Sequence, residues 1–425
     1  MKVNKNFWIL LSLLFLLIVI NAYLNDPSVE RTVFFVGTII FFSGLMTLFS
    51  NRNFSLIRSV KETRQQVGQF LNEKYEIENR NKIPIFWITI EDYSGISKKK
   101  QQIITWIPGK TKRSFYNLTY LTHRGVFTLG PTQVVYGDPF GLFSRVSIFQ
   151  STQKIIILPS FEKVTSFPEP TGSDTGGEAR KARNLEINPY AISVRDYHLG
   201  DPLKRIHWKY TAKMDKLMAK EFEDDPQSKV WILLDGDINN RIHSVEKTSE
   251  EAELNSIWRS QNRINTNYFE NSFELGISLT ASLCDYYVSN NQIIGFFSNG
   301  KQNIVFPPEG GVRQLDKILE VLASLKNDSY QSILDAVINH SAVTSKANTL
   351  ITISANTSVS FINAIQQLSL RGFQMILLSI DPSSFDISVE VEDFYDNVQQ
   401  AGVRSIRIRN NIPAVIQLPI KSISL

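Results

Sequence analysis

Two long apolar runs open the chain. The residues from Phe7 to Leu24 carry no charge, and neither do those from Thr32 to Ser50. Each run approaches the ~20 residues that about 30 Å of hydrocarbon requires, so the pattern predicts a hairpin of two transmembrane helices, 7–24 and 32–50. A cleaved signal peptide is the alternative for the first run, but the residues around Ala22 make a poor cleavage site.

Basic residues flank the outer ends of this hairpin. Lys2 and Lys5 precede the first run, and Arg52 and Arg58 follow the second, whereas the connecting loop holds one arginine beside two acidic residues. Because positive charge is retained on the cytoplasmic side, we expect a multi-pass protein of the cell membrane. Both ends of the hairpin, and everything after Ser50, should then lie in the cytoplasm.

Short alternating runs follow the hairpin, and they predict a β-rich, sandwich-like module over residues 51–175. Tyr75–Glu78, Ile85–Ile90 and Gln102–Ile107 each read as a strand between turn residues. Their spacing is typical of a small antiparallel sandwich or barrel. The turn-rich stretch Gly137–Phe143 comes next, and we interpret its aromatic residues as packing rather than recognition.

The last two hundred residues, 226–425, alternate buried strands with amphipathic helices. Apolar strands are predicted at Val230–Leu234, Gln292–Phe297, Thr349–Ile353, Phe373–Ile380 and Val403–Ile408. Leucines at helical spacing predict helices around Leu275–Tyr287 and Leu315–Leu325. This alternation indicates an α/β domain with a doubly wound, mostly parallel sheet. Between Ile238 and Asn271 lies a polar connection that is unusually long for this fold.

Acidic residues follow the first of these strands, where ligands of doubly wound sheets collect. Asp235 and Asp237, with Asn239, could coordinate a hard cation such as Mg²⁺. The loop after the strand at 349–353 supplies Ser354 and Asn356 instead of a further carboxylate. The sequence therefore predicts at most a degenerate magnesium site at Asp235 and Asp237, and the alternative is a simple strand-ending turn.

The segment 176–225 mixes charged and aromatic residues. From Ile187 to Glu223, arginines, lysines and aspartates alternate with tyrosine, histidine and tryptophan, a composition unlike that of an unconstrained linker. We interpret it as a packed junction between the β module and the α/β domain. An electropositive recognition or catalytic surface is the alternative. His198 and His207 lie nine residues apart without a third ligand at metal spacing, which argues against zinc.

This segment resembles the signature of the domain-of-unknown-function 58 family, approximately R-x-Y-x-x-G-D-x-x-R-x-I-x-W-x-x-(T/S)-A-(R/K), closed by E-F-E. The matching positions are Arg195, Tyr197, Gly200, Asp201, Arg205, Ile206, Trp208, Thr211, Ala212 and Lys213. RGVFTLGP at 124–131, DPFGLF at 138–143 and the paired apolar helices are also similar to that family. The resemblance implies a C-terminal domain like a von Willebrand factor A domain. It also implies a protein partner, a MoxR-type AAA+ ATPase or a transglutaminase-like membrane protein, but no settled activity.

Composition adds few constraints on function. Forty-five basic residues against 41 acidic ones give a net charge of +4 without local clustering, so nothing indicates nucleic acid as a partner. The single cysteine, Cys284, favours a reducing compartment. No complete motif for nucleotide, zinc or serine-hydrolase chemistry occurs. We therefore expect a membrane-tethered, non-enzymatic adaptor or scaffold without a cofactor. The alternative is an enzyme or ligand-binding protein that uses the Arg/His/Asp-rich segment in cell-envelope metabolism.

Overall fold

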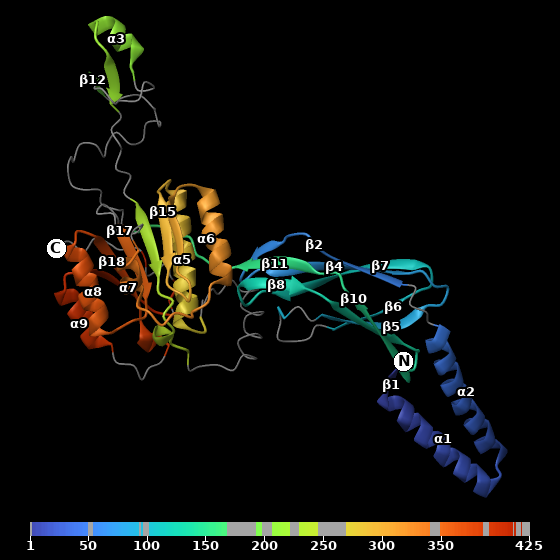
Figure 1. Ribbon diagram of the computed structural model, residues 1–425. Helices are drawn as coiled ribbons and strands as arrows, with labels where there is room; N and C mark the ends of the chain where they lie inside the picture. The colour runs from blue at the N-terminus through green and yellow to red at the C-terminus, as the bar shows by residue number, and fades with distance from the viewer. Residues whose placement is uncertain are drawn as a thin grey trace. The chain divides into compact units, whose positions relative to one another are not determined.

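The computed structural model of this chain is shown in Figure 1. It describes residues 2–49, 54–92, 95–96, 102–167, 193–197, 206–221, 229–244, 269–340, 349–385, 391–410, 412–413 and 418. These residues fall into two units, one formed mainly by the chain up to Glu162 and the other mainly by the chain after it. Each unit is described by itself.

The two apolar runs form the helices α1, Lys5–Leu24, and α2, Pro27–Phe49. None of the α1 residues is buried, so its leucines and isoleucines are not the core of a soluble domain. Asn25 ends α1 in the left-handed conformation and donates its backbone N–H to the Asn21 carbonyl. Both helices are long and apolar enough to cross a membrane, which confirms the predicted pair of apolar helices.

Eleven strands in the described part of the first unit build three sheets. They are β1 (Lys2–Val3), β2 (Phe54–Val60), β3 (Arg64–Gln66), β4 (Phe70–Asn79), β5 (Ile85–Asp92), β6 (Gln102–Ile107), β7 (Thr111–Tyr120), β8 (Gly125–Leu129), β9 (Thr132–Gly137), β10 (Phe143–Phe149) and β11 (Gln153–Leu158). The sheet orders are β1-β10-β9-β5-β6, β2-β4-β7 and β3-β11-β8. The three strands predicted in this region are present as β4, β5 and β6.

Alternation along the strands creates the core of this β module. In β4 every second residue is buried, as a strand with one solvated face requires. Tyr75 and Ile77 of β4 join one buried cluster with Ile88 of β5 and Tyr136 of β9, so two of the sheets face each other over a shared core. That packing is the predicted sandwich-like arrangement.

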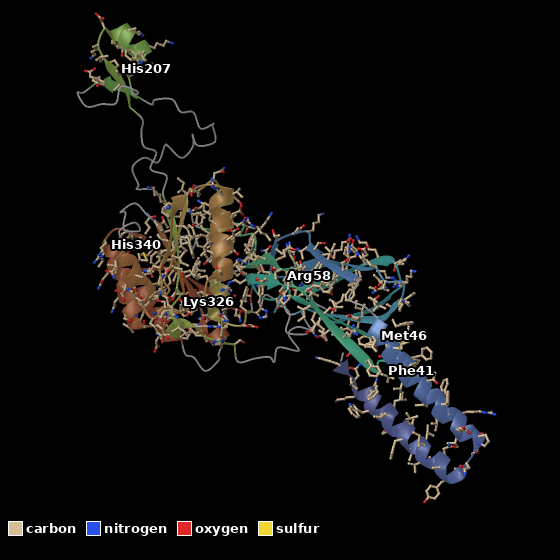
Figure 2. All side chains as sticks on the ribbon, turned by 45° about the vertical axis from the view of Figure 1, so that its right-hand side comes forward. Phe41, Met46, Arg58, His207, Lys326 and His340 are labelled. Atoms are coloured by element: carbon tan, nitrogen blue, oxygen red, sulfur yellow. The ribbon has the colours of Figure 1, made fainter. Side chains whose placement is uncertain are left out.

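One ion pair lies inside this module. Arg58 of β2 and Glu73 of β4 have side chains that are 4% and 2% exposed, and Arg58 Nε donates to Glu73 Oε1 at 3.0 Å (Figure 2). Asn117 of β7 donates to the other carboxylate oxygen at 3.1 Å. Buried charges need such partners because desolvation is costly. The pair therefore ties β2 to β4 from within the core.

The second unit is built on a six-stranded sheet. Its strands are β14 (Val230–Leu234), β15 (Ile294–Ser298), β16 (Ile304–Glu309), β17 (Thr349–Ser354), β18 (Gln374–Ile380) and β19 (Arg404–Ile408), in the order β16-β15-β14-β17-β18-β19. All neighbours are parallel except β15 and β16. Counted from β14, this is the doubly wound order 3-2-1-4-5-6. The predicted α/β sheet is thus present, with one antiparallel edge strand that the pattern did not indicate.

Helices cover this sheet. They are α5 (Ser272–Ser289), α6 (Val312–Ser324), α7 (Ile333–Ile338), α8 (Val359–Leu370) and α9 (Glu392–Gln400). Trp231 and Leu233 of β14 pack with side chains of α7, α8 and α9 in one buried cluster. The central strand β14 is buried at every position, which is why its sequence is continuously apolar.

Candidate functional site

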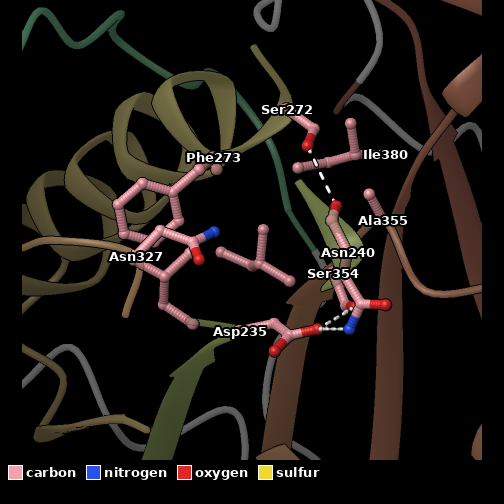
Figure 3. A pocket seen from close by; sticks show the side chains of 11 residues that line it. Asp235, Asn240, Ser272, Phe273, Asn327, Ser354, Ala355 and Ile380 are labelled. Carbon is pink, nitrogen blue, oxygen red and sulfur yellow. Dashed lines mark hydrogen bonds between the residues drawn. The ribbon is translucent and has the colours of Figure 1, made fainter. Parts of the chain in front are cut away.

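The carboxyl ends of β14 and β17 meet where the strand order reverses, and two polar residues stand there. Asp235 follows β14 directly, and Ser354 is the last residue of β17. Ser354 Oγ donates to Asp235 Oδ2 at 2.6 Å, and Asn240 Nδ2 donates to the same oxygen at 2.8 Å (Figure 3). Asp237 donates its backbone N–H to Asp235 Oδ1 at 3.0 Å. The predicted position of Asp235 at the topological switch is therefore observed.

The loop that carries Asp235 is fixed from the neighbouring strand. Gly236 donates its backbone N–H to Asn299 Oδ1 at 2.7 Å, and Ser329 donates its own backbone N–H to the Gly236 carbonyl at 3.0 Å. A Cβ at position 236 would lie 2.1 Å from the Asn299 carbonyl oxygen, so only glycine fits. Asn299 and Ser329 were not found from the sequence, because a polar residue after a strand carries no distinguishing pattern.

Burial dominates the electrostatics of Asp235. The side chain is 7% exposed. Burial raises the pKa of Asp235, while the hydrogen bonds from Ser354, from the Asp237 backbone and from Asn240 oppose part of this rise. The nearby charge of Asp237 adds to the increase. A carboxyl group held in this way is a candidate functional group on physical grounds.

The cavity beside Asp235 is small. Its volume is about 10 Å³, which gives room for about one water molecule. The lining residues come from the ends of β14, β17 and β18, from the start of α5 and from two loops; they are Leu234, Asp235, Asn240, Ser272, Phe273, Gly276, Asn327, Ile353, Ser354, Ala355 and Ile380. An organic substrate does not fit in a cavity of this size.

These residues as arranged do not fit a magnesium ion. Mg²⁺ requires nearly ideal octahedral oxygen ligation and usually at least one available carboxylate. Both oxygens of Asp235 accept hydrogen bonds, and Asp237 Oδ1 accepts the backbone and side-chain N–H groups of Asn239 at 3.0 Å. Asp237 thus caps the short helix η3, Ile238–Asn240, as a strand-ending turn would. Among the described residues no group of three or more His, Cys, Asp or Glu could hold a metal.

A second acidic residue at the same edge of the sheet was missed. Asp381 follows β18, is fully buried, and accepts from Arg407 Nε at 2.8 Å and from Arg409 Nε at 3.3 Å. The Arg407 guanidinium also lies 4.3 Å from the centre of the Tyr395 ring. Burial raises the pKa of Tyr395 to about 12. The two arginines offset the buried carboxylate, so we interpret this cluster as the element that fixes β18 to β19.

The signature segment forms a small hairpin with a helix between its strands. β12 (Ser193–Asp196) pairs antiparallel with β13 (Met218–Glu221), and α3 (Trp208–Met214) lies between them in the sequence. Arg195 is paired with Ala219, and Tyr197 donates its backbone N–H to the Leu217 carbonyl. Three of the signature positions, Gly200, Asp201 and Arg205, lie outside the described residues, as do His198 and residues 245–268 of the long connection.

Several signature residues act inside this hairpin. Ile206 is 4% exposed and forms a bridge with Ala219. The Thr211 hydroxyl accepts the backbone N–H of Met218 at 3.1 Å. His207 caps α3, because its Nδ1 accepts the backbone N–H of Tyr210 at 3.2 Å (Figure 2). These roles are structural. Capping α3 is a sufficient reason for a histidine at position 207, without a metal or a catalytic step.

The outward surface of the hairpin is apolar and basic. Trp208 is 67% exposed, Tyr210 41%, Met214 52% and Leu217 47%. Lys213 is exposed in the last turn of α3. The described part of the hairpin does not itself bury Trp208, and packing of Trp208 at a domain junction stays a prediction. Composition indicated that the segment packs against something, but it could not tell which of its aromatic side chains face solvent.

Comparison with known proteins follows from this segment. Residues 193–372 match the model of the family described as Protein of unknown function DUF58. The match begins at the first residue of β12 and continues beyond α8, so it includes the hairpin and the strands that carry Asp235 and Ser354. The predicted resemblance to that family is confirmed over this range. The description of that family names no activity. The likeness of this chain to von Willebrand factor A domains stays a prediction.

A curated relative extends the similarity to more of the chain. The sequence is 22% identical over 303 residues to the Uncharacterized protein YeaD of Bacillus subtilis (strain 168), covering 69% of this chain and 68% of that protein. That relative is itself uncharacterized, so it transfers no activity.

Two of the solved structures that match this chain are distant. The CARDB domain of the PF1109 protein from Pyrococcus furiosus, in complex with di-metal ions, has 9% identity and a TM-score of 0.20, covering 26% of this chain and 96% of that one. A beta-glucosidase from Listeria innocua, in complex with isofagomine, has 10% identity and a TM-score of 0.16, covering 24% of this chain and 16% of that one. At these TM-scores neither match bears on the fold or function.

Proposed function

We propose that this chain is a membrane-tethered, non-enzymatic adaptor whose cytoplasmic part docks a protein partner through the hairpin of the signature segment. The exposed surface of that hairpin is the observation that carries the proposal. Tyr210 and Met214, four residues apart on α3, expose an apolar strip on one side of the helix, and Trp208 is exposed at its start. Tryptophan and tyrosine are the residues that most often dominate protein interfaces. Such a face is costly to leave in water.

The hairpin's own stability supports a partner as well. Two paired strands with a seven-residue helix bury few side chains, and a two-stranded hairpin is marginally stable in water by itself. Covering the apolar face would remove it from water and stabilise the hairpin at the same time. Binding and ordering of this segment are then coupled.

The α/β domain serves as the scaffold in this proposal, and we infer that it is von Willebrand factor A-like. Its doubly wound strand order and the placement of Asp235 at the switch support that inference. The cavity beside Asp235 has room for about one water molecule, which favours a structural role for the site over the turnover of an organic substrate.

The partner class comes from the family resemblance, and a MoxR-type AAA+ ATPase is the first candidate. Exposed lysines on α3, Lys209 and Lys213, suit an acidic surface on that partner. A transglutaminase-like membrane protein is the second candidate of the same kind.

Binding of the purified ATPase to the full-length chain in lipid nanodiscs tests this function. We expect Trp208→Ala to weaken binding by about 30-fold, since a central tryptophan of an interface typically contributes at least about 2 kcal/mol. Thermal melting should change little, because the side chain is 67% exposed. Tyr330→Ala is the matched control. Tyr330 is 78% exposed in the α/β domain, so this variant should bind the ATPase as tightly as the parent does. Equal affinities of the Trp208 variant and the parent would contradict the proposed docking face.

A further inference from the structure

The turn between β9 and β10 is built more firmly than a simple loop requires. Asp138 is 1% exposed, and its carboxylate accepts the backbone N–H groups of Phe140 at 3.0 Å, Leu142 at 3.2 Å and Phe143 at 2.6 Å. Gly141 has a φ of +68°, a conformation that favours glycine. The turn therefore holds one conformation, and it presents Phe140, 55% exposed, at its tip.

This turn is fastened to the beginning of α1. β1 pairs with β10, so that Val3 lies opposite Phe143 (Figure 1). Asn4 donates its backbone N–H to the Leu142 carbonyl at 3.0 Å and its side-chain amide to the Gly141 carbonyl at 2.9 Å. Ser144 Oγ donates to Asn4 Oδ1 at 2.9 Å. The last residue before the apolar helix is thus fixed to the turn by two hydrogen bonds and to the next residue of β10 by a third.

Phe143 contacts both apolar helices. Its ring centre lies 5.1 Å from that of Phe7 in the first turn of α1. A Cβ on Gly44 of α2 would lie 3.6 Å from Phe143 Cε2, an ordinary van der Waals distance. Gly44 precedes the end of α2 at Phe49 by five residues, which corresponds to about 8 Å along a helix. Phe143 therefore lies about one and a half turns before the end of α2, whereas its contact on α1, Phe7, comes only two residues after the helix start at Lys5.

The residues around this contact are of the types that suit a membrane–water boundary. Trp8, 63% exposed, stands beside Phe7, and tryptophan is enriched where a membrane helix passes through the headgroup region. Lys2 and Lys5 are exposed just outside this level, where anionic headgroups attract them. The tip of the turn, Pro139–Gly141, carries no charge of its own.

We propose that the turn Asp138–Phe143 is a membrane-interface element, with Phe140 inserted among the lipid headgroups beside α1. Lipid is the occupant that the structure favours, because the turn is continuous with both apolar helices through Phe143 and Asn4. This inference rests on the proposed membrane anchoring. It adds a third point of contact with the bilayer, which would fix the orientation of the β module relative to the membrane surface.

Site-directed spin labelling of the full-length chain in nanodiscs that contain anionic lipid tests this inference. The native Cys284 is fully buried and burial raises the pKa of its thiol, so introduced cysteines can be labelled selectively. A nitroxide on Phe140→Cys should collide more with oxygen, which concentrates in the bilayer, than with a water-soluble nickel complex. Phe15→Cys in the middle of α1 and Val126→Cys on β8, 70% and 53% exposed in the parent, give the lipid and water references.

The outcomes separate this inference from the anchoring on which it depends. If the Phe140 label behaves like the Val126 label while the Phe15 label reports lipid, the turn does not insert into the interface, and the proposed membrane anchoring still holds. A Phe15 label in water would overturn both. Dipolar broadening between Phe140 labels would show that a second copy covers the tip, which also overturns the proposal. A photoreactive phenylalanine analogue at position 140 retains the ring, and it should crosslink to lipid.

Discussion

At the scale of single residues, hydrogen bonds from Ser354, Asn240 and the Asp237 backbone hold the carboxyl group of Asp235. Asp235 is the first residue after a fully apolar strand, and the geometry of parallel sheets then determines where its side chain lies. The partners of Asp235 could not be predicted, because Ser354 is 119 residues away and Asn240 approaches through a turn. Pairing between distant polar residues leaves no periodic pattern in a sequence.

The buried carboxyl of Asp235 predicts a definite dependence of stability on pH. Burial raises its pKa above the ordinary value of 3.8, so the folded chain binds this proton more tightly than the unfolded chain. The resulting stabilisation is present below pH 3.8 and is lost as the pH rises through the raised pKa. Asp235→Asn does not titrate, so the unfolding free energy of the parent minus that of the variant should decrease from pH 4 to pH 8.

Urea unfolding at several pH values measures this difference. Asp316→Asn is the matched control, since Asp316 is exposed on α6 and the argument from burial does not apply to it. A difference for Asp235→Asn that stays flat or increases with pH would contradict the assigned effect of burial.

At the scale of elements, apolar runs were the reliable signal. β14, β17, β18 and β19 begin and end within one or two residues of their predicted limits. The first three are buried at nearly every position, so their apolar runs mark them clearly. β16 was missed because Pro307 and Pro308 interrupt its apolar run. Proline lacks a backbone N–H, and an edge strand tolerates it because the N–H groups on its outer side need no partner strand. β1 is two residues long and pairs with a strand about 140 residues away, which no local pattern indicates.

The ion pair that joins β2 to β4 should be essential to the β module. Arg58→Ala leaves Glu73 buried without its cation, and we expect a loss of about 3–5 kcal/mol in unfolding free energy. Replacing both partners by apolar residues, Arg58→Met with Glu73→Leu, should cost much less, because no buried charge then remains. Thermal and urea unfolding of the purified chain measure both.

An exposed ion pair on the same strand provides the comparison. Lys112 Nζ lies 2.6 Å from Glu76 Oε2, and the two side chains are 55% and 19% exposed. Lys112→Ala should leave the melting temperature nearly unchanged, because water solvates these charges. If Arg58→Ala were as mild as Lys112→Ala, the pair at the core would not stabilise the module.

At the scale of the whole molecule, the sequence predicted the order of parts along the chain: apolar helices, β module, signature segment and α/β domain. That order follows from changes in hydrophobic period, which a sequence displays directly. The use of the signature segment could not be predicted in the same way. Its aromatic residues suit a buried junction and an exposed binding face equally well, and the melting and binding of Trp208→Ala would distinguish these two arrangements.

The proposed adaptor requires a particular membrane topology, which is open to direct measurement. Lys2 and Lys5 precede α1, and Arg52 and Arg58 follow α2, whereas the two helices are joined by two residues, Asn25 and Asp26, in the described structure. From the positive-inside rule we propose that both basic ends remain in the cytoplasm. A reporter that is active only in the cytoplasm should therefore be active when fused after Leu425.

A second fusion distinguishes the ways in which this topology could fail. A reporter that works only outside the cytoplasm should be active when fused after Asn25, and silent when fused after Leu425. If both fusions reported the cytoplasm, α1 would not cross the membrane. If the fusion after Asn25 reported the cytoplasm and the fusion after Leu425 reported the outside, the β module and the α/β domain would lie outside. The proposed cytoplasmic ATPase could then not reach the face around Trp208.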